Sequence, residues 1–270
     1  MKAVALGGCL SASLPLSLSL CLTLAAVPAQ AAFTELYKQD FERPTGFVND
    51  AGDVNIFRTV NQLYSGQPAG FTFAQTHTVE TLLVGGSTAW GTGFQDPQGV
   101  AGRHALGLLS SVENDYLGLA FDVGSSGYLN FRLDVSSIDL DRWGGPFVAA
   151  GGQAPVFRIS LFDNPGGAAG IGSGTALSWA DVTGTASPLK NTFDWTNVVV
   201  PLSTAGNTNG NVILRIDLLS GGYAAMDNFV VAASDTPGEV PPIPEPATVA
   251  LMLGGLVALG AHARLRRPAP

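Results

Sequence analysis

Cysteine and histidine are scarce in this chain, and their positions limit its chemistry. The 270 residues include 2 Cys, Cys9 and Cys21, both near the N-terminus. The remainder therefore has no disulfide, no thiol nucleophile and no cysteine metal ligand. Of the 3 His, His77 and His104 fall in the central region. Neither has a GxSxG-like or HExxH-like stretch beside it, so both are expected at the surface or in turns. A zinc site built from the two histidines and a carboxylate stays open.

Basic residues are also few. Residues 32–243 carry 9 Lys and Arg against 20 Asp and Glu, a net charge of −11. Such a surface repels phosphate backbones, so we expect no nucleic acid as partner. The excess of carboxylates is compatible with divalent cations.

Long amphipathic helical stretches are missing, and alternating apolar and polar residues dominate the central region. With 46% hydrophobic residues, 34 Gly and 17 Pro, the composition favours many short strands joined by turns. The alternation is clearest in residues 127–135, where Leu129, Phe131, Leu133 and Val135 share one face. Further strands are predicted within 69–79, 105–110, 116–123, 156–163, 193–202, 211–219 and 223–231. One apolar and one wet face per strand predict an all-β fold, an antiparallel β-sandwich of jelly-roll type, in residues 32–232.

The N-terminus is typical of an export signal. Met1 and Lys2 supply a positive start, and residues 10–26 are apolar and rich in leucine. Ala29 and Ala31 fit the small-x-small pattern for cleavage before Ala32, so residues 1–31 are predicted to be a signal peptide. The alternative is a permanent N-terminal membrane anchor, which Pro15 and the interleaved serines disfavour.

The C-terminus combines a proline-rich segment, an apolar segment and arginines. Residues 233–243 are predicted to be a linker that holds the sandwich away from the membrane. Residues 247–263 contain no charged side chain apart from His262, and their 17 positions are just enough for a transmembrane helix. Arg264, Arg266 and Arg267 follow and would stay on the cytoplasmic side. The prolines before the helix, from Pro241 to Pro246, form a stiff, extended and accessible peptide.

This tripartite order, Pro244-Glu245-Pro246, apolar helix and arginine-rich end, resembles the PEP-CTERM sorting signal of Gram-negative bacteria. The resemblance covers residues 244–270 and implies recognition by an exosortase, a transpeptidase-like membrane enzyme that cleaves at or near the PEP motif. The protein would pass through the inner membrane and reach the cell surface or the extracellular polysaccharide matrix. The alternative is an ordinary single-span membrane protein with a proline linker.

Carboxylates near both ends of the sandwich suggest a calcium site. Asp40 and Glu42 in DFERP, and Asp227 in MDNFVV, resemble the first and last strands of carbohydrate-binding-module-like jelly rolls, where such residues commonly meet at a structural calcium. Ca²⁺ prefers six to eight oxygen ligands, and pairing of the end strands would gather these side chains. Asp227 shares parity with Phe229 and should point inward, where it needs a partner. The alternative is that Asp227 only caps a turn. No other cofactor is expected.

Three functional hypotheses follow. The first is a non-enzymatic exported protein with a structural or adhesive role. The second is a carbohydrate-binding module that contacts matrix polysaccharide through aromatic residues beside glycines, namely Trp90, Trp143 and Tyr223, whereas Trp179 and Trp195 are expected in the core. The third, a glycan-active enzyme, would use the strand residues Asp122, Asp134, Asp163 and Asp217. For these carboxylates, ion pairing such as Arg132 with Asp134 and Arg215 with Asp217 is the preferred interpretation.

Overall fold

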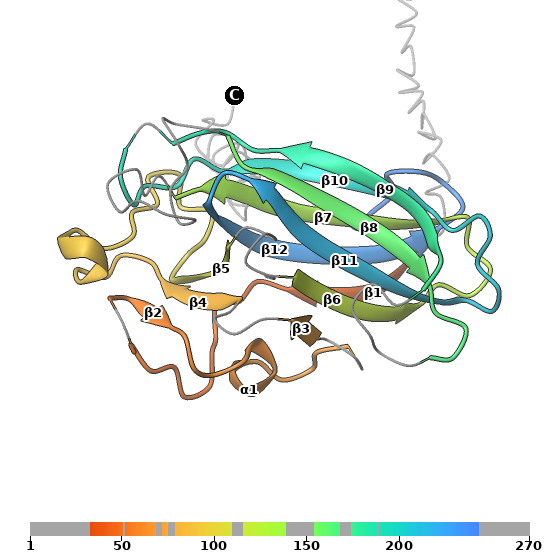
Figure 1. Ribbon diagram of the computed structural model, residues 1–270, viewed down its shortest axis with the longest axis horizontal. Helices are drawn as coiled ribbons and strands as arrows, with labels where there is room; N and C mark the ends of the chain where they lie inside the picture. Colours follow the sequence, from red (N-terminus) through yellow and green to blue (C-terminus); the bar gives the residue numbers. More distant parts are fainter. Residues whose placement is uncertain are drawn as a thin grey trace, which may run out of the picture. The chain divides into compact units, whose positions relative to one another are not determined.

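A computed structural model describes residues 33–50, 52–68, 72–74, 79–109, 116–138, 154–167, 174–187 and 189–242. Within these residues the strands form two antiparallel sheets that stack face to face (Figure 1). The predicted all-β antiparallel sandwich is confirmed. The predicted signal peptide, its cleavage site and residues 244–270 lie outside the described residues.

The two sheets take their strands from along the whole domain. Sheet A has the order β10 (Thr196–Ser203), β7 (Tyr128–Ser137), β12 (Tyr223–Ser234), β5 (His104–Leu109), β4 (Glu80–Leu83) and β2 (Val54–Asn55). Strand β1 (Phe33–Gln39) also belongs to sheet A: it pairs with the second half of β12, whereas β5 pairs with the first. Sheet B has the order β3 (Thr72–Ala74), β6 (Tyr116–Asp122), β11 (Asn211–Ser220), β8 (Val156–Asp163) and β9 (Ala176–Thr183). The short helices are α1 (Val60–Leu63) and the 3-10 helix η1 (Ala89–Gly91).

The main core lies between the sheets. Leu129, Phe131, Leu133 and Val135 of β7 are all fully buried in it, as their alternation predicts. Phe229 packs edge-on against Phe131 and against Phe41, with ring centroids 5.0 and 5.1 Å apart. This burial of alternate residues from both sheets is the main source of stability for such a sandwich.

A second, smaller core includes residues of β4, β5 and β12 together with the loop residues around η1 and before β10. Phe94 and Phe193 stack in it with centroids 6.0 Å apart, and Trp195 is buried against Phe193. Asp53 connects two of these segments, because its carboxylate accepts hydrogen bonds from the backbone N–H groups of Thr88 and Ala89 at 2.7 and 2.8 Å. The buried carboxylate therefore satisfies the first amides of η1.

Strand β12 contains a β-bulge. Its register against β7 passes from Asp227 opposite Asp134 to Val230 opposite Arg132, which inserts one extra residue. Asn228 lies in the bulge with a φ of 52°, a left-handed conformation that asparagine tolerates better than most residues. The bulge turns the Asn228 side chain toward Asp134, where its Nδ2 donates to Asp134 Oδ2 at 2.9 Å.

The predicted linker does not stand clear of the sandwich in its described part. Strand β12 continues to Ser234, two residues into the predicted linker, and the segment after it returns to β7. Arg132 Nη1 donates to the carbonyl of Pro241 at 2.5 Å, which ties the segment to the outer face of sheet A. Among the described residues, no helix is long and apolar enough to cross a membrane, and the predicted helix 247–263 is not part of them.

Candidate functional site

The outer face of sheet B presents an exposed tryptophan. Trp179 of β9 is 59% exposed, so the expectation that it lies in the core is wrong. β9 is the edge strand of sheet B, and in the exposure pattern of the strand only Val182 is buried. The guanidinium of Arg158 on β8 lies over the Trp179 ring, 4.3 Å from its centroid. Arg158 is held there by Asp181, to which its Nε and Nη2 donate at 2.8 and 2.9 Å.

A second arginine on the same face is also surrounded by aromatic rings. The guanidinium of Arg215 on β11 lies 5.0 Å from the ring centroid of Phe162 and 5.4 Å from that of Tyr116. Arg215 also forms an ion pair with Asp217 at 2.9 Å, which confirms the predicted pairing of these two residues. Burial raises the pKa of Asp217 above its ordinary value, and Arg215 opposes this shift.

From β6 to β9, the outer face of sheet B therefore carries a row of aromatic rings and arginines. We call this set the aromatic row, and it consists of Tyr116, Phe162, Trp179, Arg158 and Arg215. Neighbouring strands lie about 4.8 Å apart, so a row across four strands spans roughly 14 Å. The apolar faces of the rings and the donors of the arginines are arranged along one surface.

The predicted glycan-binding residues have different positions. Tyr223 is 3% exposed in the second core, and its hydroxyl donates to Glu80, so it cannot present a ring to a ligand and this prediction is wrong. Trp90 belongs to η1, and Trp143 lies outside the described residues. Trp195 is in the core, as expected.

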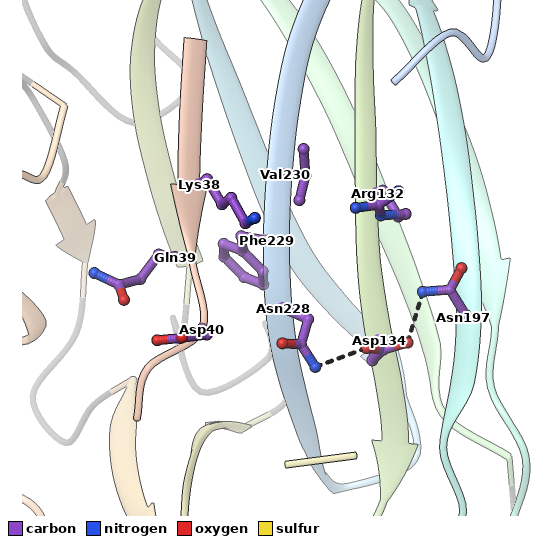
Figure 2. Close-up of a pocket in the computed structure, with 9 residues that line it drawn as sticks. All are labelled: Lys38, Gln39, Asp40, Arg132, Asp134, Asn197, Asn228, Phe229 and Val230. Atoms are coloured by element: carbon purple, nitrogen blue, oxygen red, sulfur yellow. Dashed lines mark hydrogen bonds between the residues drawn. The ribbon is translucent and has the colours of Figure 1, made fainter. Parts of the chain in front are cut away.

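The outer face of sheet A contains a cavity of about 300 Å³. Figure 2 shows its lining residues: Lys38, Gln39, Asp40, Arg132, Asp134, Asn197, Asn228, Phe229 and Val230. Asp134 lies between two amides, because Asn197 Nδ2 donates to its Oδ1 at 2.7 Å and Asn228 Nδ2 to its Oδ2. The predicted ion pair of Arg132 with Asp134 is not formed, because the Arg132 guanidinium is directed to Pro241.

The four strand carboxylates proposed for glycan hydrolysis are not gathered into an acid and base pair. Asp134 belongs to sheet A, whereas the other three belong to sheet B. Asp217 is paired with Arg215, and Asp163 accepts from Asn207 Nδ2 at 2.9 Å and from the Thr208 N–H at 3.1 Å. Asp122 accepts from the Gly124 N–H at 2.8 Å. Each carboxylate thus has a local structural role.

The residues predicted to bind calcium have unequal surroundings. Asp227 is fully buried, but the predicted parity with Phe229 is wrong, because the bulge separates the two residues and Asp227 pairs with Asp134. Its Oδ1 accepts from the Asn228 N–H at 2.6 Å, and its Oδ2 has no hydrogen-bond partner in the described part of the chain. Burial raises the pKa of Asp227 well above its ordinary value, and the negative charges of Glu42, Asp134 and Asp40 add to this shift.

Asp40 and Glu42 flank the buried Phe41 and are less enclosed. The Glu42 carboxylate accepts from the Arg103 N–H at 3.0 and 3.1 Å, and Asp40 Oδ1 accepts from the Glu42 N–H at 3.2 Å. Within the described residues, no three His, Cys, Asp or Glu side chains form a group that could hold a metal ion. The orphaned oxygen of Asp227 fits a cation, whereas the engaged Glu42 fits it less well, so calcium binding stays a prediction.

The one histidine of the central region that the structure describes is not a surface residue. His104 begins β5 and is buried, which corrects the prediction, and its ring centroid lies 5.2 Å from that of Phe47. Burial lowers the pKa of His104, against the opposing effect of Glu42. His77 lies outside the described residues.

Comparison with known families identifies the C-terminal signal. Residues 242–267 match the family model of the PEP-CTERM protein-sorting motif, which confirms the predicted sorting signal. The motif implies an exported protein whose membrane-anchored C-terminal signal is processed by an exosortase. The match ends there and does not include the sandwich.

Comparison of the fold gives distant similarities. The structure named "CBM4 structure and function" is similar over 73% of this chain and 97% of its own, at 8% identity and a TM-score of 0.35. A Stig cyclase from Fischerella sp. TAU is similar over 77% of this chain and 100% of its own, at 16% identity and a TM-score of 0.43. The CBM22-1 xylan-binding domain of a Paenibacillus barcinonensis protein covers 77% and 99%, at 12% identity and 0.34. No curated protein matches the sequence. These similarities are too distant to indicate what the sandwich binds.

Proposed function

We propose that this chain is a non-enzymatic adhesion protein of the cell envelope or the extracellular polysaccharide matrix, and that its sandwich binds polysaccharide through the aromatic row. The observation that carries this proposal is the exposure of Trp179. A tryptophan that is 59% exposed forfeits much of the free energy that its burial would supply, so its place on a wet sheet face suggests a binding role.

The chemistry of the aromatic row suits a sugar. The C–H faces of a pyranose are apolar and slightly positive, and they pack favourably on the negative face of an indole ring. Because Arg158 lies over one face of the Trp179 ring, the sugar would stack on the opposite face. Guanidinium groups beside the ring donate several hydrogen bonds in fixed directions, which suits sugar hydroxyl groups. Arg158 is already positioned by Asp181, so little side-chain entropy is lost on binding.

The charge of the domain narrows the ligand class. With a net charge of −11 over residues 32–243, the sandwich repels strongly anionic polymers at low salt. Arg158 and Arg215 do not reverse this locally, because each is paired with an aspartate. We therefore propose a neutral polysaccharide as the ligand.

Replacing Trp179 by alanine tests this proposal. The variant is expected to bind the host's purified extracellular polysaccharide at least tenfold more weakly, a loss of about 1.4 kcal/mol, because the stacking surface is removed. Affinity electrophoresis in gels containing the polysaccharide measures the change. Stability should be nearly unchanged, since exposed side chains contribute little to folding.

Phe57→Ala is the matched control, because Phe57 is a 74% exposed aromatic residue near β2 and does not belong to the aromatic row. The proposal is supported if the polysaccharide in the gel no longer retards Trp179→Ala but retards Phe57→Ala as much as the unmodified protein. Equal retention of both variants and the unmodified protein would exclude binding through the aromatic row and leave a purely structural role.

A further inference from the structure

The segment that follows β12 is bound to the outer face of sheet A. Asn130 Nδ2 donates to the carbonyl of Thr236 at 3.2 Å, and the Gly238 N–H donates to Asn130 Oδ1 at 2.7 Å. Arg132 Nη1 then donates to the carbonyl of Pro241 at 2.5 Å. Both Asn130 and Arg132 belong to β7, which has β10 on one side and β12 on the other. The segment therefore lies across the face of the sheet and is not added at an edge.

The residues involved are suited to hold this segment. Asn130 is fully buried, and its amide also donates to Ser234 Oγ at 3.0 Å, so both its oxygen and its nitrogen are used. Gly238 has a φ of +78°, a conformation that non-glycine residues adopt only with strain. Two of the three hydrogen bonds of this buried amide are made to the segment, so detachment would break both of them and leave Asn130 with Ser234 alone.

The sequence around and beyond the last of these bonds is rich in proline. Pro241, Pro242, Pro244 and Pro246 restrict the backbone to extended conformations. Glu245 is four residues beyond Pro241 in the sequence, and a fully extended chain of that length reaches at most about 14 Å. Proline-rich chains keep their direction over several residues, so a fixed Pro241 also restricts where the PEP motif can lie.

We propose that Asn130 and Arg132 are positioning residues for the processing of this chain: they hold the segment on sheet A and present the PEP motif to the processing enzyme close to that face. This inference rests on exosortase processing. Without these bonds, eleven residues of free chain would join Ser234 to the PEP motif, and the sandwich could turn in any direction about the motif. Orientations that place the sandwich between the motif and the enzyme would slow capture without any change in the motif itself.

Pulse–chase labelling of the full chain in its host tests the proposal, with the processed fraction measured by intact mass. Gly238→Pro removes the N–H that bonds to Asn130 and acts outside the sheets, and we expect it to slow processing roughly three- to tenfold. Arg132→Ala should have a similar effect, and Arg132→Lys, which keeps a donor, should restore part of the rate. Pro237→Ala, an exposed neighbour of Gly238, is the matched control and should be processed normally.

Two further variants distinguish positioning from other causes. Insertion of Gly-Ser-Gly-Ser after Pro242 lengthens and loosens the chain, so it should slow processing. An unchanged or faster rate would mean that the segment only supplies length, and it would overturn the proposal.

Pro244→Ala with Glu245→Ala reports on the enzyme's requirement for the motif. If this double variant blocks processing while Gly238→Pro does not affect it, only the positioning inference fails. If neither variant affects processing, exosortase sorting fails as well. Thermal melting of the accumulated Gly238→Pro and Arg132→Ala proteins separates slow processing from unfolding, since positioning predicts near-normal midpoints for Gly238→Pro.

Discussion

Replacement of Asp53 by alanine is expected to lower the free energy of unfolding by about 2 to 3 kcal/mol, since four donors lose a shared charged acceptor and one of them, the Ala89 N–H, is buried. These donors are the N–H groups of Thr88 and Ala89, the Thr88 hydroxyl at 2.5 Å and Asn49 Nδ2 at 3.1 Å. Thr88 and Ala89 are far from Asp53 in the sequence, whereas Asn49 lies on the other side of the turn that contains Asp53. We therefore expect the second core to loosen as a unit.

The dependence of stability on pH gives this prediction a second readout. Burial alone would raise the pKa of Asp53, but the hydrogen bonds from Thr88, Ala89 and Asn49 outweigh it and hold the pKa below its ordinary value. Because its pKa is lower in the folded state than in the unfolded state, ionised Asp53 stabilises the fold at pH values above the ordinary pKa of aspartate. This stabilisation is lost as the pH falls toward the folded-state pKa. The Asp53→Asn variant should lose that part of the acid sensitivity.

Urea unfolding at pH 7 and at pH 3 measures both effects. Glu35→Gln, an exposed carboxylate on β1, is the control and should stay within about 0.5 kcal/mol of the unmodified protein. An Asp53→Ala variant as stable as this control would show that the carboxylate is not required to hold η1.

Calcium is expected to raise the melting temperature of the protein by several degrees over that in chelator, because an ion bound only to the folded state stabilises it by about 2.7 kcal/mol at one hundred times its dissociation constant. The residue responsible would be Asp227, whose Oδ2 is buried and has no protein partner among the described residues. A carboxylate in this position requires either a proton or a cation.

The pH dependence distinguishes the two. In chelator, the raised pKa of Asp227 means that the folded state favours the protonated carboxyl. Ionised Asp227 therefore lowers the free energy of unfolding, and this destabilisation is relieved as the pH falls through the raised pKa. A bound cation favours the ionised form, so with calcium the stability should instead fall with decreasing pH. Asp227→Asn should abolish both responses. Identical melting curves in calcium and chelator would remove Asp40, Glu42 and Asp227 as calcium ligands and leave a proton as the partner of Asp227.

The strands that the sequence predicts well are those with one strictly buried face. β6, β7, β8 and β11 alternate because the main core covers one side of each, so their periodicity is strong. The alternation does not predict β9, because as an edge strand it buries little and alternates weakly. For the same reason the sequence wrongly assigns Trp179 to the core. A tryptophan in a strand is expected to be buried unless that strand is known to be an exposed edge strand.

The candidate sites were harder to predict, because they depend on which segments the sheets bring together. Tyr223 lies beside glycines in the sequence, as an exposed loop residue often does, but β12 carries it into a second core that is built from distant loops. No local pattern signals that core. The docking of the segment after β12 is equally invisible, although Arg132 and Asn130 on the polar face of a central strand are the residues that would suggest it in retrospect.

The bulge at Asn228 also determines how the length of this chain can vary. Before it, the even-numbered Ala224 and Met226 face the main core; after it, the odd-numbered Phe229 and Val231 do so. The extra residue therefore shifts the alternation of core-facing and outward-facing side chains by one position within a single strand. Loops between strands can gain or lose residues with little consequence, but loss of a single residue here would exchange the two sides of everything that follows, including the end of β12 from which the sorting signal extends.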